Sequence, residues 1–181
     1  MGLGAFPGNH PLWLGMPGMH GTVAANRAIH HADVILAIGL RFDDRVTGKV
    51  SRFAPHAHTI IHVDIDPAEI GKVVRTHIPI VGDSRLVLKE LLKGAKALRL
   101  AAWWRELEEW RTRYPLRYRP KPHLQSQEVI RAFYEATGGH AIVTTGVGQH
   151  QMFAAQFFPV TRPRSFLTSG GLGTMGVGLP F

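Results

Sequence analysis

Short apolar runs bounded by polar residues recur through the first half of the chain. They are DVILAIG, TIIHVD and HIPIVGD, residues 33–39, 59–64 and 77–83. Each run has the length and composition of a buried β-strand. Each ends in glycine or aspartate, so we expect the carboxyl ends of these strands to carry the polar groups of the region.

Helix signals separate these runs. Thr22 can cap a helix over about 23–31, and Asp66-Pro67 places a capping carboxylate before a proline at a first helical position. Asp83 or Ser84 can cap a third helix over 86–98, whose leucines fall on overlapping faces: Leu86, Leu88, Leu91 and Leu92. Strands that alternate with helices in this way predict an α/β fold with a parallel sheet.

The pattern changes after residue 100. Aromatic residues and a leucine recur there at helical spacing, which predicts a helix packed on a neighbour: Trp103, Leu107, Trp110 and Tyr114. Three prolines within residues 115–122 then prevent a helix or a central strand from continuing. We therefore expect a helix and a proline-rich linker over 101–124, with the linker itself at about 114–124.

A second α/β unit is predicted from residue 125 onward. A capped helix over 126–137 ends at Gly138-Gly139, and AIVTTG and SFLTSG have the pattern of strands. Between them, GVGQHQMFAAQFF places a glycine loop before a helix. Two short strands rarely fold alone, so we expect these residues to be the beginning of a larger domain.

Composition narrows the class of protein. The 181 residues are 45% hydrophobic, which suffices for one domain or for parts of two. Cysteine is absent, which excludes disulfides and cysteine-ligated zinc and fits a reducing compartment. No apolar run approaches the ~20 residues of a membrane helix, and the first residues lack the basic region of a signal peptide. A soluble, cytoplasmic protein is therefore expected.

Basic residues outnumber acidic residues by 21 to 13, which gives a net charge of +8. The excess is partly concentrated in the helix and linker after residue 100: Arg105, Arg111, Arg113, Arg117, Arg119 and Lys121. A basic segment can bind nucleic acid. A solvated helix face is the more common arrangement, and it is the interpretation favoured here.

Three other patterns carry little weight. The 11 histidines include His30-His31, His56 and His58, but these spacings do not match a zinc motif. Residues 171–176 spell GxGxxG after a predicted strand. This motif indicates a loop where the backbone can approach a cofactor, but it is too weak to identify a particular dinucleotide. No GxSxG motif occurs, and nothing nominates a catalytic acid, base or nucleophile.

A candidate phosphate site lies where the first strand ends. The opening residues 2–21 form a glycine- and proline-rich loop, whose length is uncommon unless the loop binds something. Backbone amides of Gly18, Gly21 and Gly39 could approach a phosphate. The helix that begins after Thr22 favours anions at its N-terminus.

The stretch GLRFDDRVTG, residues 39–48, has two interpretations of equal weight. Arg41 and Arg45 could hold phosphate with planar, permanently charged groups, while Asp64 ends a strand where acids bind ribose in dinucleotide folds. Alternatively, the charged side chains form only a salt-bridge network: Arg41, Asp43, Asp44 and Arg45. Residue types alone leave both interpretations open.

Six motifs, taken in order, resemble those of a known family. They are LGMPGMHGT, GLRFDDRVTGK, IIHVDIDPAEIGK, PIVGD, VGQHQMFAAQF and SGGLGTMGVGLP. Their order and spacing are similar to those of the acetolactate (acetohydroxyacid) synthase large subunit, a thiamine-diphosphate enzyme family of branched-chain amino-acid synthesis. The resemblance implies the later part of a Rossmann-like central FAD-binding domain at 1–100. It also implies the start of the thiamine-diphosphate-binding domain at 125–181.

The resemblance also implies which residues lie near cofactors. The implied FAD contacts are Gly18, Met19, His20, Gly21, Gly39, Leu40, Arg41, Phe42, Asp43, Arg45, Val46, Asp64, Ile65, Gly82 and Asp83. The implied thiamine-diphosphate contacts are Gln149, His150, Gly173 and Met175. The residues implied near the substrate channel are Met19, His20, Asp44 and Arg45.

The implied reaction decarboxylates pyruvate and joins the resulting hydroxyethyl group to pyruvate or 2-oxobutyrate. Thiamine diphosphate, FAD and Mg²⁺ are the implied cofactors, but the family's activating glutamate and its Mg²⁺ ligands match nothing in this sequence, so we expect the chain alone to be inactive. The implied partners are further copies of the full-length subunit and a regulatory small subunit, with neither nucleic acid nor membrane. The alternatives are another thiamine-diphosphate carboligase or oxidase, such as one acting on glyoxylate, and a non-catalytic flavin- or nucleic-acid-binding module.

Overall fold

The computed structural model describes residues 2–179, which form two compact units. The three-stranded unit contains Pro17–Pro115. The two-stranded unit combines the residues before Pro17 with those after Pro115. These two units differ from the predicted domains, because the opening residues pack in the two-stranded unit. The domain boundaries at 1–100, 101–124 and 125–181 therefore stay predictions.

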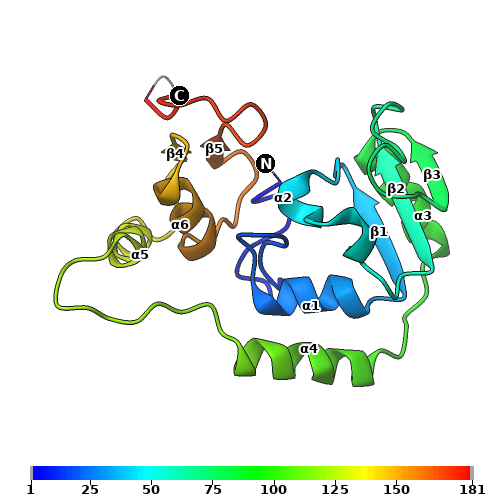
Figure 1. The fold of residues 1–181 in the computed structure, drawn as a ribbon, viewed down its shortest axis with the longest axis horizontal. Coiled ribbons are helices and arrows are strands. Elements are labelled where there is room, and N and C mark those ends of the chain that lie inside the picture. Colours follow the sequence, from blue (N-terminus) through cyan, green and yellow to red (C-terminus); the bar gives the residue numbers. More distant parts are fainter. Residues whose placement is uncertain (1, 180–181) are drawn as a thin grey trace. The chain divides into compact units, whose positions relative to one another are not determined.

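The three-stranded unit is a parallel sheet with helices beside it (Figure 1). Its elements are α1 (Val23–His31), β1 (Val34–Ile38), α2 (Asp44–Thr47), the 3-10 helix η1 (Val50–Arg52), β2 (Thr59–Asp64), β3 (Ile78–Val81), α3 (Ser84–Gly94) and α4 (Ala101–Arg113). The strand order is β1-β2-β3, and β2 pairs in parallel with both neighbours, so β1 and β3 form the edges. The three predicted strands and the α/β class with a parallel sheet are confirmed.

The register of the strands places one face of the sheet in a core. Ala37 of β1 lies opposite His62 of β2, which lies opposite Pro79 of β3. The buried apolar residues of this core are Ala37, Phe42, Ile60 and Val74. On the other face, Val63 of β2 is fully buried, whereas Val34 and Leu36 of β1 are nearly half exposed, so this face is covered less completely at β1.

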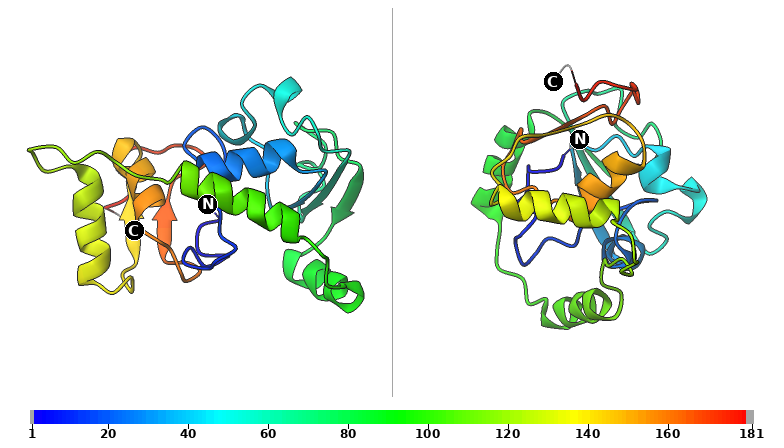
Figure 2. Two further views of the ribbon diagram at one scale, coloured as in Figure 1. Left: turned by 90° about the horizontal axis from the view of Figure 1, so that it is seen from below. Right: turned by 90° about the vertical axis from the view of Figure 1, so that its left-hand side faces the viewer.

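Helices α1 and α4 lie side by side, as both views in Figures 1 and 2 show. Leu107 and Trp110 of α4 are buried, and the Trp110 ring lies 5.2 Å from the ring of His31 on α1. The guanidinium of Arg27 lies 4.9 Å from the centre of the Tyr114 ring, a favourable cation–π distance. The predicted packing of this aromatic helix face on a neighbour is therefore confirmed.

The helix predicted from Asp66-Pro67 does not form, and turns occupy residues 67–71 instead. The Asp64 carboxylate accepts the amide of Asp66, and the Asp66 carboxylate accepts the amide of Ala68, both at 2.9 Å. Each bond spans two residues and closes an Asx turn, which competes with helical hydrogen bonding. The chain therefore bends twice where the sequence indicated a helix cap.

The third predicted helix forms earlier than expected, as α3. Asp83 caps it by accepting the amides of Arg85 and Leu86 at 2.9 and 3.0 Å, so the cap is Asp83 and not Ser84. The helix ends at Gly94 instead of residue 98. Glycine has low helix propensity, which accounts for the earlier end.

The two-stranded unit contains α5 (Ser126–Ala136), β4 (Val143–Thr145), α6 (Gln149–Phe157) and β5 (Phe166–Thr168). Both predicted strands form, as β4 and β5; they pair in parallel, and each has only three residues. The core of the unit contains Ala154, Phe158, Val160 and Phe166. Gly138 and Gly139 end α5 with φ values of 56° and 72°, which side-chain-bearing residues rarely adopt. The predicted glycine loop after β5 is described up to Leu179, and its Pro180 lies outside the described residues.

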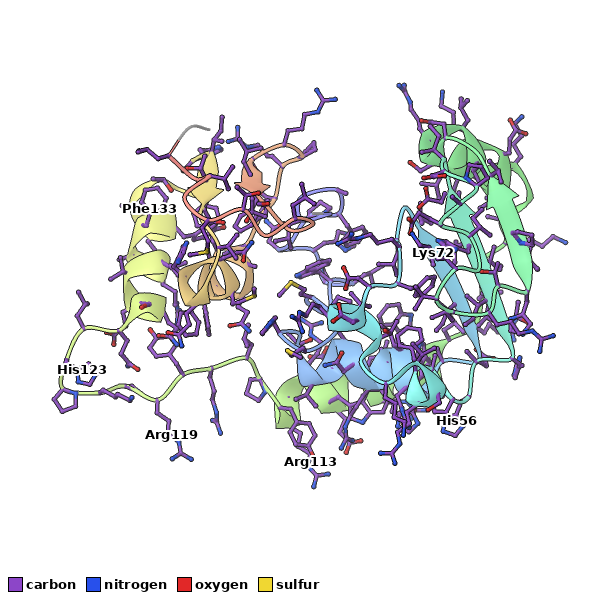
Figure 3. The ribbon with its side chains drawn as sticks, turned by 45° about the horizontal axis from the view of Figure 1, so that its top comes forward. His56, Lys72, Arg113, Arg119, His123 and Phe133 are labelled. Carbon is purple, nitrogen blue, oxygen red and sulfur yellow. The ribbon has the colours of Figure 1, made fainter. Side chains whose placement is uncertain are left out.

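No helix or strand forms within residues 114–125, as the three prolines predict. Figure 3 labels Arg119 and His123 on this segment, and both side chains are exposed. Arg105 and Arg113 of α4 are also exposed, which agrees with the predicted solvated face. Within residues 2–179, no helix is both long and apolar enough to cross a bilayer.

Candidate functional site

The carboxyl ends of β1, β2 and β3 meet at one edge of the sheet, which we call the cofactor edge. The Gly39 amide donates to the Val63 carbonyl at 2.8 Å, and the Gly82 amide donates to the Asp64 carbonyl at 2.9 Å. These bonds extend the pairing one residue beyond β1 and β3. The structure thus brings together the predicted site residues at the strand ends: Gly39, Asp64, Gly82 and Asp83.

Asp43 organises the turn between β1 and α2. Its carboxylate accepts the amides of Arg45 and Val46, both at 3.1 Å, and caps α2. The same carboxylate lies 3.2 Å from the Arg41 guanidinium, while Asp44 lies 3.6 Å from the Arg45 guanidinium. Both ion pairs of the salt-bridge interpretation therefore exist. They leave Arg41 and Arg45 51% and 65% exposed, so a ligand can still reach either group.

The loop that precedes α1 packs directly on this turn. The Met19 amide donates to the Arg45 carbonyl at 2.8 Å. Gly18 has a φ of 90°, and a Cβ atom there would lie 2.2 Å from the same carbonyl oxygen. Asn26 of α1 holds Gly18 from its other side, because its amide group accepts from Gly18 N at 2.7 Å and donates to Gly18 O at 2.9 Å. The loop and the turn therefore form a single continuous surface.

The glycine amides expected to cradle a phosphate already donate within the protein. Gly18 donates to Asn26, Gly21 donates to the Gly18 carbonyl at 3.0 Å, and Gly39 donates to Val63. This expectation from the sequence is wrong for the described conformation, because the loop folds back on itself and the sheet bonding continues through Gly39. A phosphate at this edge would instead meet arginine side chains and the first turn of α1. Helix geometry leaves the first amides there without intrahelical acceptors.

The apolar and histidine side chains among the implied FAD contacts differ in how far they are exposed. Phe42 is 1% exposed, and its ring packs edge-on against His62 and Phe53. Only the backbone of Phe42 can face a ligand in this conformation. Met19 and Ile65, in contrast, are 65% and 72% exposed and present their side chains. His20, Leu40 and Val46 are partly buried, so the edge combines buried side chains with exposed apolar groups.

A second group of predicted residues lies where α6 begins in the two-stranded unit. Gly148, with a φ of 143°, comes directly before α6, whose first two side chains are Gln149 and His150. Both side chains are exposed. A Cβ atom on Gly146 would lie 3.3 Å from His150 Nε2, so the end of β4 and the start of α6 are in close contact.

The glycine loop after β5 returns to this place. A Cβ atom on Gly178 would lie 2.6 Å from the Gly146 amide nitrogen, so only glycine fits this approach. Gly173 has a φ of 65°, and Met175 is 76% exposed. The structure therefore brings the loop with Gly173 and Met175 to the same end of β4 as Gln149 and His150, and leaves it open to solvent.

Sequence reasoning missed a buried polar network beneath this second group. The Gln151 side-chain amide donates to Thr168 Oγ1 at 2.7 Å, and the Thr168 and Thr145 hydroxyls lie 2.7 Å apart. Gln151 and Thr145 are 7% and 5% exposed. One signal was available, since Gln151 precedes Ala154 by three residues and so shares the apolar face of its helix. The network joins α6, β4 and β5 beneath Gln149 and His150.

The structure also gathers three histidines that their sequence spacing did not connect. The ring centroids of His30, His31 and His56 lie 5.0 to 5.7 Å from one another. Figure 3 labels His56 near the end of α1. Among residues 2–179, no group of histidine, aspartate or glutamate side chains is arranged to hold a metal ion. These imidazoles therefore pack as rings.

Comparison with known proteins finds similarity along both units. A model described as "Thiamine pyrophosphate enzyme, central domain" matches residues 1–91, and one described as "Thiamine pyrophosphate enzyme, C-terminal TPP binding domain" matches residues 146–181. The chain is 50% identical to the acetolactate synthase isozyme 3 large subunit of Escherichia coli K12. It is 51% identical both to acetolactate synthase 1, chloroplastic, of Zea mays and to the acetolactate synthase large subunit of Corynebacterium glutamicum. These alignments cover 99% of the chain but 33%, 29% and 30% of the relatives, so the chain spans about a third of their length.

Proposed function

The chain belongs to the thiamine pyrophosphate enzyme family, and on that basis we propose that it is part of an acetolactate synthase large subunit. The observation that carries the proposal is an identity of 50% or more to three acetolactate synthases over 99% of the chain. The proposed reaction decarboxylates pyruvate and transfers the resulting hydroxyethyl group to pyruvate or 2-oxobutyrate. It would serve the synthesis of valine, leucine and isoleucine.

Thiamine diphosphate is the proposed reactive cofactor, which would supply the electron sink for decarboxylation when it is bound. On this chain, Gln149 and His150 would contact it from the start of α6. The exposed Met175 offers an apolar surface for a ring, and Gly173 turns the loop with a φ of 65°. These positions supply one wall of a site, which fits a role in orienting the cofactor and shielding it from water.

FAD is the proposed ligand of the cofactor edge, where it would be largely structural. The Asp64 carboxylate accepts one backbone amide and has further lone pairs for a ribose hydroxyl. Arg41 and Arg45 can pair with phosphates, and α1 has no acidic residue in its first turn to repel them. The donor set therefore fits a dinucleotide, with the phosphates held by side chains and a helix N-terminus.

The remaining parts of the proposal rest on the resemblance of the sequence motifs to the acetolactate synthase family. Mg²⁺ would be held by residues outside this sequence. The longer subunit would form homo-oligomers, bind a regulatory small subunit and act in the cytoplasm, with no role for nucleic acid. Met19, His20, Asp44 and Arg45 would lie near the substrate channel.

The flavin assignment is tested by Arg41→Ala in a longer polypeptide. For this purpose, the chain replaces the matching third of the E. coli large subunit. We expect the variant to retain less flavin after gel filtration, because one guanidinium at the phosphates is lost. Arg105→Ala, at an exposed position of α4, is the matched control and should retain the wild-type amount. Equal flavin content in both variants would contradict the assignment.

The same chimera tests the reaction. We expect it to form acetolactate from pyruvate and to prefer 2-oxobutyrate over glyoxylate as a second substrate. We expect no acetolactate from the 181-residue chain alone. A chimera that condenses glyoxylate and leaves pyruvate unchanged would replace the proposal with a glyoxylate carboligase.

A further inference from the structure

His62 is fully buried beneath the turn that follows β1. It lies on the central strand β2, with Ala37 and Pro79 as its register partners on either side. Its Nε2 atom lies 2.7 Å from the carbonyl oxygen of Leu40, the second residue of the turn. A carbonyl oxygen can only accept, so Nε2 carries the proton and His62 is the donor.

This donor leaves the other ring nitrogen unsatisfied. With the proton on Nε2, Nδ1 is an acceptor, and it is buried without a hydrogen-bond partner among the described residues. An unsatisfied buried polar atom is costly. The other buried residues of β2, Ile60 and Val63, are apolar. Packing alone would therefore favour an apolar residue at position 62, and the bond to Leu40 accounts for the histidine.

The ring of His62 also supports a strained residue of the same turn. Phe42 has a φ of 52°, which is uncommon for an aromatic residue. Its ring meets the ring of His62 edge-to-face, with centroids 5.0 Å apart and an interplanar angle of 79°. Phe53 contacts the Phe42 ring in a similar way at 5.7 Å. Leu40 and Phe42 flank Arg41, so His62 holds the backbone before Arg41 and the side chain after it.

We infer that His62 is a positioning residue for the cofactor edge. Its Nε2–H fixes Leu40 and its ring fixes Phe42, and together they direct Arg41 outward and place Asp43 to cap α2. His62 does not touch the ligand and acts only through these neighbours. The inference rests on the proposed flavin site, because it names the residue that shapes that site from within the core.

Two substitutions separate the two contacts of His62. His62→Phe keeps an aromatic ring for Phe42 and removes the donor to Leu40. His62→Gln keeps an N–H donor of similar reach and removes the ring. His77→Gln is the matched control. The Nδ1 atom of His77 also bonds to backbone, since it accepts from the Ile60 amide at 3.0 Å. His77 directly precedes β3, so it lies at the opposite end of the strand from the cofactor edge.

The first measurement uses the 181-residue chain without ligand. We expect the ¹⁵N spectrum of the His62 ring to show the neutral Nε2–H tautomer. We expect the Arg45 and Val46 amides to exchange with solvent about tenfold faster in His62→Phe, equivalent to about 1.4 kcal/mol. In His62→Gln, the exchange rates of these amides should be closer to those of the wild type. In His77→Gln, they should equal the wild-type rates. An Nδ1–H tautomer, or unchanged exchange in His62→Phe, would overturn the inference.

The second measurement is flavin dissociation from the chimera. We expect His62→Phe to bind flavin about tenfold more weakly, as follows from the loss of one buried donor. His62→Gln should recover part of that affinity. If the unsubstituted chimera holds no flavin, the proposed site is wrong, while the tautomer and exchange data still decide the role of His62. If it holds flavin and His62→Phe holds it equally well, the positioning role is overturned and the flavin site stands.

Discussion

The two candidate sites lie at equivalent places in their sheets and differ in how many contacts stabilise their loops. Both lie at the carboxyl ends of parallel strands, beside glycines with positive φ. At the cofactor edge, aspartates cap the helices that follow, Asn26 clamps the loop, and His62 supports the turn from the core. In the two-stranded unit, most residues of the loop after β5 are exposed, with Leu172 at 96% and Met175 at 76%. A surface whose loops are stabilised by caps and core residues is suited to bind a ligand by itself. An exposed apolar loop is suited to complete a site together with other residues.

The largest test of this difference is Gly18→Ala. A Cβ atom there would lie 2.2 Å from the Arg45 carbonyl oxygen, and the φ of 90° is unfavourable for alanine. We expect the free energy of unfolding of the three-stranded unit to fall by about 3 kcal/mol or more, because backbone must move. Hydrogen exchange of the β1 and β2 amides measures the effect.

Gly71→Ala is the control for this substitution. Its φ is 72°, but the nearest atom to an added Cβ is 4.0 Å away. It should cost only about 1 kcal/mol, the conformational penalty alone. Equal costs for the two variants would mean that the contact between loop and turn does not hold the cofactor edge together.

Thr168→Val tests the weaker site in the two-stranded unit. The change removes the acceptor of the buried Gln151 amide and the partner of Thr145. We expect a loss of about 2 kcal/mol in that unit, since the buried Gln151 amide keeps only its long bond to the Ser169 carbonyl, at 3.5 Å. Thr144→Val, at the neighbouring exposed position, should change it by less than about 0.5 kcal/mol. Hydrogen exchange of the β4 amides during thermal unfolding would measure the effect in this unit. An equal loss of stability in the three-stranded unit would show that the network does not act on the two-stranded unit alone.

Asp43→Ala tests the aspartate cap at the cofactor edge. The variant loses the acceptor of two α2 amides and the partner of Arg41. We expect about 1 kcal/mol of destabilisation, the usual cost of an N-cap, and faster exchange at Val46. Asp44→Ala removes only a pair whose side chains are 65% and 77% exposed, and should cost less than about 0.5 kcal/mol. If the two substitutions had the same effect, the turn would be held by general charge and not by the cap.

The smallest stability effect is expected for Arg45→Gln. Its ion pair is exposed, so the free energy of unfolding should change by less than about 0.5 kcal/mol. Flavin retention in the chimera should nevertheless fall, because Arg45 faces the proposed phosphates. Lys72→Gln breaks a comparable surface pair, with Glu69 at 2.7 Å, and should alter neither quantity. A stability loss equal to that of Asp43→Ala would show that Arg45 has a structural role.

The sequence predicted the strands and the edge at which they end, because local apolar runs and capping residues suffice for both. Thr22 and Asp83 cap the predicted helices, as their side-chain chemistry indicates. The Asp66-Pro67 signal was equally good and failed, since two successive Asx turns bend the chain before a helix can begin. A cap identifies a place where a helix can start, but nearby side-chain bonds decide whether it does.

The arrangement of the sites depended on contacts between distant segments, which a single sequence does not reveal. Gly18 looked like a phosphate-binding glycine, but Asn26 and Arg45 occupy its surroundings. His62 looked like one polar residue in an apolar strand, and its bond to Leu40 depends on how the turn folds back. Gln151 was detectable only as a polar residue on an apolar helix face. Local patterns therefore indicated where the candidate sites lie, whereas their internal hydrogen bonds could be described only from the fold.

The sheet order has a consequence for how the chain behaves at high concentration. Strands β1 and β3 are both edges, and an edge strand can pair with a strand of another molecule. Pro79 lies within β3 and removes one backbone donor from that edge. The sequence of β1, VILAI, contains no proline and no charge. Self-association should therefore proceed through β1, and a single lysine in place of the nearly half-exposed Leu36 should raise the concentration at which the chain stays dispersed.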